Sequence, residues 1–307
     1  MARWDTPFWY GSREFTAQDL ELIVGTARRF GRLGLGEVVA TICENLPWLA
    51  PNGKPKLLAC RELLQKLEAA GIVELPARRM APSSRPNSKS ERIGTPPPLP
   101  SVTATLKELQ PVRVEPVPAA ENPQWNAMMV AHHPLGFQRA FGAQQKYWIR
   151  DGSTGVPRVL GGILFAAAAR HLADRDRWIG WEPEEQQRFR HRIVANSRYL
   201  ILPGVQVPHL ASYVLGAALR RLPADWVQRY GFAPVLVETF VERPWGGTCY
   251  RAANWKLIGE TAGRGRQDRA RAYASTVKTI WVYPLGRDWR ERLRAPLEQA
   301  PASEWDV

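Results

Sequence analysis

The sequence is poor in cysteine and lacks the spacings that cysteine-based sites need. Its three cysteines, Cys43, Cys60 and Cys249, form no Cys-x-x-Cys pair, and their odd number argues against a disulfide framework. We therefore expect a reducing compartment and no structural zinc. The five histidines include no His-Glu-x-x-His motif, so no metal-ligand set stands out, and use of a divalent metal stays an open alternative.

Long apolar runs are also absent. No stretch of about 18 or more apolar residues occurs, and the first residues, MARWDTPFWY, contain no apolar signal core. We expect no membrane association and a cytoplasmic protein.

Acidic residues are outnumbered by basic ones. The chain has 42 Lys and Arg against 29 Asp and Glu, a net charge of +13. Such a surplus favours a polyanionic partner, with DNA as the first expectation and RNA as the alternative. At 307 residues and 45% hydrophobic content the chain has room for two domains, and its oligomeric state stays open.

The first 79 residues predict a helical domain. Helices are expected over residues 16–29, after Gly36, and over 56–70, followed by a short strand at 72–76. Three helices and a strand follow the order of a winged helix-turn-helix, a DNA-binding unit. The alternative is a small packing domain whose lysines are merely solvated. The DNA-binding interpretation assigns phosphate or groove contacts to Lys54, Lys56, Arg61, Lys66, Arg78 and Arg79.

Residues 80–124 differ from the sequence on either side. Prolines are frequent, serines cluster, and aromatic residues are absent. This composition predicts a linker, extended or disordered, between two domains.

The remainder, 125–307, predicts a mixed α/β sheet followed by a basic tail. Strands and helices alternate along it. The expected strands are 146–150, 158–165, 199–202, 235–240, 256–261 and 279–283, and the expected helices are 182–193, 209–222 and 249–255.

One acid, Glu238, lies inside an apolar strand. A carboxylate there must be paired, protonated or used, because a bare charge in an apolar interior costs several kcal/mol. A structural interpretation pairs it with Arg251 or Arg198. A functional one gathers polar residues into a cleft for acid/base or metal-assisted phosphodiester chemistry, with Glu238, Tyr250 and Arg251 in one site. The candidate catalytic residues are Glu238, Tyr250, Arg251, Asn254, His133 and Asp176.

A basic glycine loop follows the strand 256–261. Its guanidinium groups on a flexible backbone favour contact with an anion. The expected nucleic-acid contacts there are Arg264, Arg266, Arg269 and Arg271, with a solvated loop as the alternative.

The strand order of residues 125–285 resembles the GNAT acyltransferase fold. The resemblance implies a GNAT-like mixed sheet with helices on both faces, and it places Tyr250 near the general-acid tyrosine of many such enzymes. In those enzymes a Gln/Arg-x-x-Gly-x-Gly/Ala loop cradles coenzyme A. The matching residues 203–209, PGVQVPH, lack that pattern, and Pro208 removes a donor amide, which argues against acetyl-coenzyme A as cofactor.

Longer motifs resemble the family of DruA, a protein of the Druantia anti-phage system with relatives near transposable elements. They include HHPLG (132–136), RDRWIGW (175–181), NSRYLILP (196–203), HLAS (209–212), ETFV (238–241), GTCYRAANW (247–255) and GETAGRGR (259–266). The resemblance implies DNA-linked work in defence or mobile-element biology, with other proteins of such systems as partners. The alternatives are a DNA-processing enzyme of nuclease or transposase type, a non-catalytic DNA-binding adaptor, and an acyltransferase.

Overall fold

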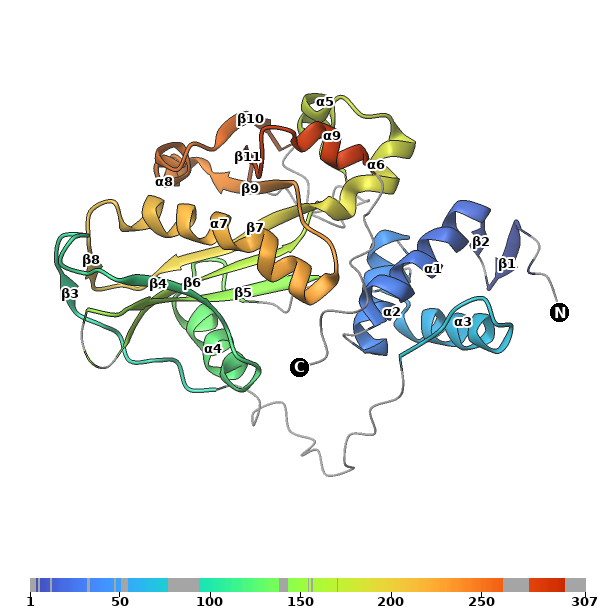
Figure 1. Ribbon diagram of the computed structural model, residues 1–307, viewed down its shortest axis with the longest axis horizontal. Coiled ribbons are helices and arrows are strands. Elements are labelled where there is room, and N and C mark those ends of the chain that lie inside the picture. The colour runs from blue at the N-terminus through green and yellow to red at the C-terminus, as the bar shows by residue number, and fades with distance from the viewer. Residues whose placement is uncertain are drawn as a thin grey trace. The chain divides into compact units, whose positions relative to one another are not determined.

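A computed structural model describes residues 4, 6–11, 13–31, 34–46, 48–50, 55–76, 94–137, 143–153, 155, 157–169, 171–261 and 276–295 (Figure 1). The chain divides into two compact units, residues 1–83 with 141–143 and residues 84–140 with 144–307. None of the helices within the described ranges has both the length and the apolar character needed to cross a bilayer.

The described residues of the N-terminal unit form a hairpin and three helices. Strands β1 (Phe8–Tyr10) and β2 (Arg13–Phe15) pair antiparallel and precede α1 (Ala17–Phe30), α2 (Leu35–Asn45) and α3 (Leu57–Ala69). Helix α1 begins where the sequence predicts it. Thr16 accepts a hydrogen bond from the Asp19 amide while the Asp19 carboxylate accepts one from the Thr16 amide, a reciprocal capping box.

The expected wing strand is absent from residues 72–76. Gly71 ends α3 with a φ of 71°, the Ile72 amide donates to the Leu67 carbonyl at 2.9 Å, and the Leu75 amide donates to the Glu68 carboxylate at 3.2 Å. These amides are satisfied locally and need no strand partner. The winged helix-turn-helix is therefore not confirmed, and the hairpin of this unit comes before its helices instead of after them.

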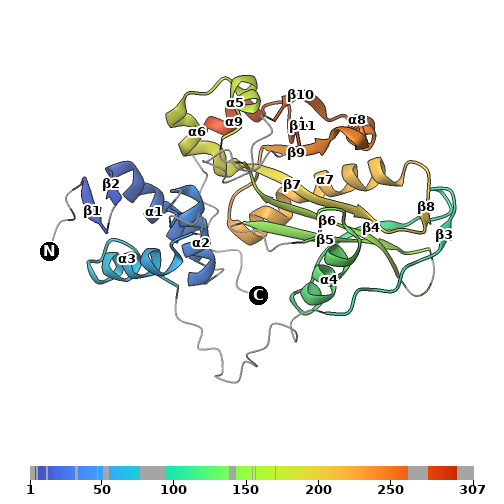
Figure 2. The same ribbon diagram turned by 180° about the vertical axis from the view of Figure 1, so that it is seen from behind.

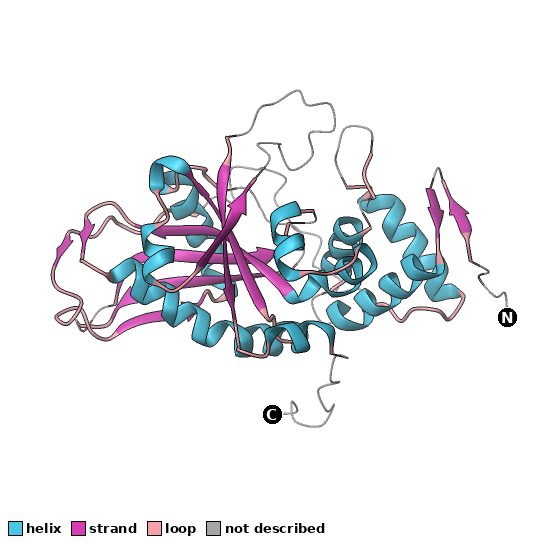
Figure 3. Ribbon diagram, turned by 90° about the horizontal axis from the view of Figure 1, so that it is seen from above, coloured by secondary structure: helices cyan, strands magenta, loops and turns pink. Residues whose placement is uncertain are grey.

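A seven-stranded sheet organises the second unit (Figure 3). Its order is β10-β11-β9-β7-β6-β5-β4, and all neighbours are antiparallel except β7 and β9. The expected mixed α/β class is confirmed. The strands are β4 (Val112–Pro116), β5 (Gln144–Asp151), β6 (Arg158–Ala167), β7 (Ile193–Ile201), β9 (Leu236–Glu242), β10 (Lys256–Glu260) and β11 (Lys278–Pro284).

Part of the expected linker belongs to this sheet unit. Strand β4 is its edge strand and pairs with β5, with Val112 and Val114 buried. A second strand, β3 (Val102–Thr103), pairs parallel with β8 (Val205–Gln206). The expectation of a linker through residue 124 does not hold here, because two alternating valines supply a buried face and prolines are tolerated at a sheet edge. The short helix η3 (Ala119–Glu121) and α4 (Asn122–His132) follow.

Helices cover both faces of the sheet, as expected (Figures 1 and 2). Helix α4 packs Trp125 against Trp148, Leu164 and Leu200 at one end of the first face. At the other end of this face, α5 (Ala173–Ile179), α6 (Pro183–Phe189) and α9 (Trp289–Arg294) surround Leu236 and Val282.

The second face carries α7 (Leu210–Tyr230) and α8 (Thr248–Ala252). The Tyr147 hydroxyl donates to Asp225 of α7 at 2.7 Å, and the Tyr199 hydroxyl donates to the Ala211 carbonyl of α7 at 2.8 Å. Since Tyr147 and Trp148 are neighbours on β5, their side chains lie on opposite faces. The sheet is thus enclosed between two helical layers.

Two helix boundaries differ from expectation. Helix α7 continues through Pro223 to Tyr230, because Trp226 and Tyr230 extend the buried face beyond Leu222. The charged helix expected over 182–193 ends earlier: α6 stops at Phe189, η4 (Arg190–Arg192) follows, and β7 begins at Ile193. The early start of β7 supplies the three residues that pair with β9.

Candidate functional site

The candidate site residues of the sheet unit flank the point where β7 separates from β9. The two strands pair only over Ile193–Ala195 and Leu236–Glu238. One residue later β7 has a bulge, because Leu164 pairs with Arg198 while Phe165 pairs with Asn196, which leaves Ser197 as the extra residue. Three separate polar groups lie around this point.

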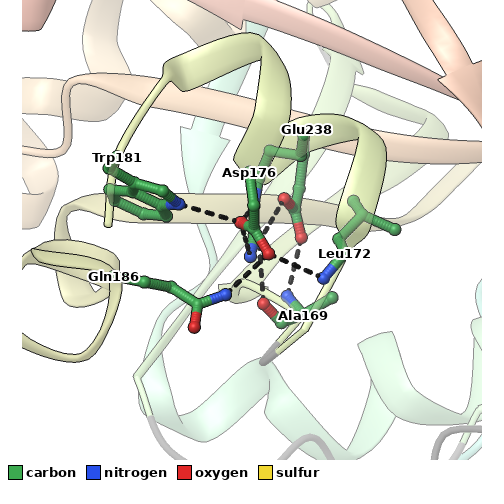
Figure 4. Close-up of polar contacts among 7 residues, drawn as sticks. Ala169, Leu172, Asp176, Trp181, Gln186 and Glu238 are labelled. Atoms are coloured by element: carbon green, nitrogen blue, oxygen red, sulfur yellow. Dashed lines mark hydrogen bonds and ion pairs between the residues drawn. The ribbon is translucent and has the colours of Figure 1, made fainter. Parts of the chain in front are cut away.

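The first group is centred on Glu238, labelled in Figure 4, and on its partner Arg175. Neither side chain has any solvent exposure, and their ion pair is 2.9 Å long. The second carboxylate oxygen accepts the Ala169 amide at 2.6 Å, and Arg175 also donates to the Ala169 carbonyl at 2.7 Å. Glu238 is therefore paired with Arg175, and the expected partners Arg251 and Arg198 are wrong.

Asp176 completes this group. One of its oxygens accepts Arg175 Nε at 2.8 Å and Trp181 Nε1 at 3.1 Å, and the other accepts the Leu172 amide and Gln186 Nε2 (Figure 4). Burial alone would lower the pKa of Arg175, but Glu238 and Asp176 outweigh it and hold the pKa above its ordinary value. Arg175 therefore stays positively charged, and its ion pair with Glu238 links α5 to β9.

The second group lies on the opposite face of the sheet. The Tyr250 hydroxyl donates to Asn196 Oδ1 at 2.8 Å, and Thr239 Oγ1 donates to the Asn196 carbonyl at 3.0 Å. Burial raises the pKa of Tyr250 above its usual value. This tyrosine is 8% exposed, and its hydroxyl already donates a hydrogen bond to Asn196. It therefore links α8 to β7.

The third group joins the turn after α4 to β7. Arg198 Nε donates to the Gly136 carbonyl at 2.9 Å, and the Leu135 amide donates to His133 Nδ1 at 3.1 Å. Burial, with the positive charge of Arg198, lowers the pKa of His133 to about 4. The imidazole is neutral at pH 7, and since Nδ1 accepts, its proton is on Nε2. His133 is therefore set up to donate a hydrogen bond at Nε2 instead of accepting a proton there.

Arg251 and Asn254 belong to none of these groups. Both are exposed; the Arg251 guanidinium lies over the Trp281 ring at 5.8 Å, and Asn254 has a φ of 63° where the chain leaves α8. The expected convergence of Glu238, Tyr250 and Arg251 is wrong. Glu238 and Thr239 are neighbours on β9, so a helix that contacts the Thr239 face cannot reach Glu238.

The expected nucleic-acid contacts are only partly within the described residues. Lys56 precedes α3 and is half-buried, Arg61 and Lys66 are exposed on α3, and the Lys66 ammonium lies 4.9 Å from the Tyr10 ring centroid. The others lie outside the described residues: Lys54, Arg78, Arg79, Arg264, Arg266, Arg269 and Arg271.

The segment expected at a coenzyme A loop is covered by the chain itself. The Val102 amide donates to the Gly204 carbonyl at 2.9 Å, and a Cβ on Gly204 would lie 2.5 Å from the Pro100 carbonyl oxygen. A hollow of about 680 Å³ beside this segment is lined by Glu108, an acid that would repel a pyrophosphate. The residues present do not fit coenzyme A.

Metal ligands do not gather in the part of the chain that the structure describes. No group of three His, Cys, Asp or Glu side chains there could hold an ion. Cys249 is half-buried, and burial raises the pKa of its thiol.

The sequence profile of the family described as "Druantia protein DruA" matches residues 67–276, more than half of the chain. The chain belongs to the DruA family. The matched region of this DruA family member contains the pairs Arg175 and Glu238, Asn196 and Tyr250, and His133 and Arg198, so all three polar groups lie within it. No curated protein matches the chain.

Several solved structures are similar to this DruA family member. A spermidine N-acetyltransferase chimera from Vibrio cholerae and hSSAT shares 10% identity and a TM-score of 0.37, covering 57% of this chain and 95% of its own. A point mutant of the spermidine N-acetyltransferase from Vibrio cholerae shares 8% identity and a TM-score of 0.37, covering 59% of this chain and 97% of its own.

Proposed function

We propose that this DruA family protein acts in anti-phage defence by binding DNA, and that the buried network around Glu238 stabilises the fold instead of cleaving the phosphodiester backbone. The observation that carries the proposal is the uneven distribution of charge. Residues 125–307 contain 26 Lys and Arg and 16 Asp and Glu, whereas residues 1–79 contain 11 and 9. The surplus that favours a polyanion is therefore concentrated in the sheet unit and its tail.

A structural role for Glu238 is supported by the contacts of its oxygens. Arg175 binds one carboxylate oxygen of Glu238 and the Ala169 amide donates to the other. The Glu238 side chain has no exposed surface. A carboxylate that activates water or holds a metal needs a lone pair directed at its substrate or ion. Asp176 likewise has both oxygens engaged.

The turn at His133 and Arg198 supports binding over cleavage. A neutral imidazole with its proton on Nε2 is a hydrogen-bond donor that suits a phosphate oxygen. As a general base the same ring would need its Nδ1, which already accepts the Leu135 amide.

Acyl transfer is the weaker alternative. Its expected general acid, Tyr250, is buried and donates to Asn196, and the segment that would hold coenzyme A is paired with β3. Both features favour the DNA-binding proposal.

The test is a titration of the full chain with labelled DNA at several salt concentrations. The affinity should fall steeply as salt rises, because each neutralised phosphate releases counterions. A neutral protein of similar size serves as control. Binding at low salt no stronger than that of the control would refute the proposal, and cleavage of the DNA by the purified chain would refute the structural role given to Glu238.

A further inference from the structure

Exposed apolar and cationic side chains occur on β10, the edge strand of the sheet, and on the segments beside it. Trp245 is 66% exposed, Leu257 54% and Val277 37%. Arg251 is exposed beside them, and Arg243 is 67% exposed. These five residues are called the Trp245 surface below.

Trp281 connects these residues. It pairs with Leu257 across the β10–β11 ladder, and the Arg251 guanidinium lies 5.8 Å from its ring centroid. A Cβ on Gly247, two residues after Trp245, would lie 2.8 Å from the same ring. Leu257 and Arg251 therefore lie beside one buried indole, and the turn that follows Trp245 runs next to the same ring.

The backbone of Trp245 is fixed although its ring is in solvent. It ends the short helix η5 (Arg243–Trp245), where the Gly246 amide donates to the Arg243 carbonyl at 3.2 Å and the Gly247 amide to the Trp245 carbonyl at 2.7 Å. Gly247 has a φ of 65° and no room for a side chain, so this turn requires glycine. A rigid turn thus presents a free aromatic face.

The charge around this face is positive. Arg243 binds both oxygens of Glu260, at 3.0 and 3.2 Å, so the acid is neutralised, while the exposed Arg251 carries charge beyond it. An exposed aromatic ring next to arginine on a sheet is suited to single-stranded nucleic acid, whose unpaired bases stack on the ring while its phosphates contact the cations. A duplex offers no free base face to an indole.

We infer that the Trp245 surface binds single-stranded nucleic acid by stacking a base on Trp245, with Arg251 contacting the adjacent phosphate. The inference rests on the proposed DNA binding and adds the strand form that is bound. It assigns Trp245 a role in binding and none in catalysis.

The experiment measures fluorescence anisotropy of labelled oligothymidylate and of a matched duplex with the full chain. Trp245→Ala should weaken single-strand binding about tenfold, the loss expected for one base stack, and change duplex binding less than about twofold. Trp245→Phe should retain most of the affinity, because a phenyl ring still stacks. Trp9→Ala is the matched control, since Trp9 is 67% exposed in the N-terminal unit. Melting temperatures should be unchanged.

The outcomes separate the two proposals. If the natural chain binds neither form of DNA, the proposed function fails and this inference with it. If it binds DNA but Trp245→Ala binds the single strand as tightly as the natural chain, only the inference fails. If sedimentation shows that Trp245→Ala dissociates a dimer of the natural chain, the surface is an interface between copies, and the inference is again overturned.

Discussion

Glu238 and Arg175 lie 63 residues apart in the chain, yet their side chains form a 2.9 Å ion pair from which solvent is excluded. Glu238→Gln removes the fully buried one of the two carboxylates that pair with this guanidinium and leaves Asp176 as its remaining counter-charge. We expect the free energy of unfolding to fall by about 3–5 kcal/mol, measured by chemical denaturation. Glu260→Gln, which breaks the exposed pair with Arg243, should cost less than about 1 kcal/mol. Full stability together with lost phage protection would instead assign Glu238 to chemistry.

Tyr250→Phe removes the hydroxyl that donates to Asn196 within the interior. The stranded amide oxygen should cost about 1–3 kcal/mol of stability. Phage protection by cells that carry the complete defence system should fall no further than the stability loss accounts for. A variant that folds as well as the natural protein but protects nothing would contradict the structural role.

His133 should make the protein lose stability in acid. Its pKa is lowered to about 4 in the folded chain, whereas an unfolded histidine titrates near 6.5. The unfolded chain therefore binds a proton first as the pH falls from about 6.5 to 4, and the melting temperature should drop over that window. In His133→Asn the amide oxygen replaces Nδ1 as acceptor of the Leu135 amide and does not titrate. Its melting curve should be flatter over the same window, and an identical slope in both proteins would show that His133 is not the cause.

Strand β4 provides a test of where the linker ends. Val114 is 6% exposed and Leu99 is 53% exposed, although both lie in the proline-rich stretch. We expect Val114→Ala to reduce the free energy of unfolding by about 2 kcal/mol. Leu99→Ala is the control and should be neutral. If neither substitution changes the free energy of unfolding, residues 112–116 belong to the linker and not to the sheet.

Coenzyme A should not bind with useful affinity. Calorimetric titration of the full chain with acetyl-coenzyme A should show no binding tighter than about millimolar, beside an authentic acetyltransferase as positive control. The reason is the pairing of β3 with β8, which covers the backbone that would face the pyrophosphate. Micromolar binding would overturn the interpretation of that segment.

The sequence predicted local secondary structure well, but it did not predict which side chains that are distant in the chain contact each other. The capping box at Thr16 and the apolar run that became β9 were predictable, because both signals depend on adjacent residues. That Glu238 needs a partner followed from its apolar neighbours. Which of 42 Lys and Arg supplies it did not follow, since the choice depends on how α5 packs against β9.

The predicted convergence of Tyr250 with Glu238 failed for a related reason. Periodicity places Glu238 and Thr239 on opposite sides of β9, but it does not say which side the next helix covers. The contact of Tyr250 with Asn196 places α8 on the Thr239 side. Likewise, the prolines around β4 were visible in the sequence, whereas its pairing with a strand some 30 residues later was not.

The Arg175–Glu238 pair also sets an order of assembly during synthesis. Strands β4 to β7 and helix α5 leave the ribosome before β9 does, so Arg175 emerges well ahead of Glu238, the second of its two carboxylate partners. Until Glu238 arrives, Asp176 of the same helix is its counter-charge, and closing α5 over the growing sheet would bury the guanidinium with its hydrogen bonds incomplete. We therefore expect the nascent chain to stay partly open between α5 and the sheet. The parallel pairing of β9 with β7 brings Glu238 to Arg175 and completes this face of the sheet.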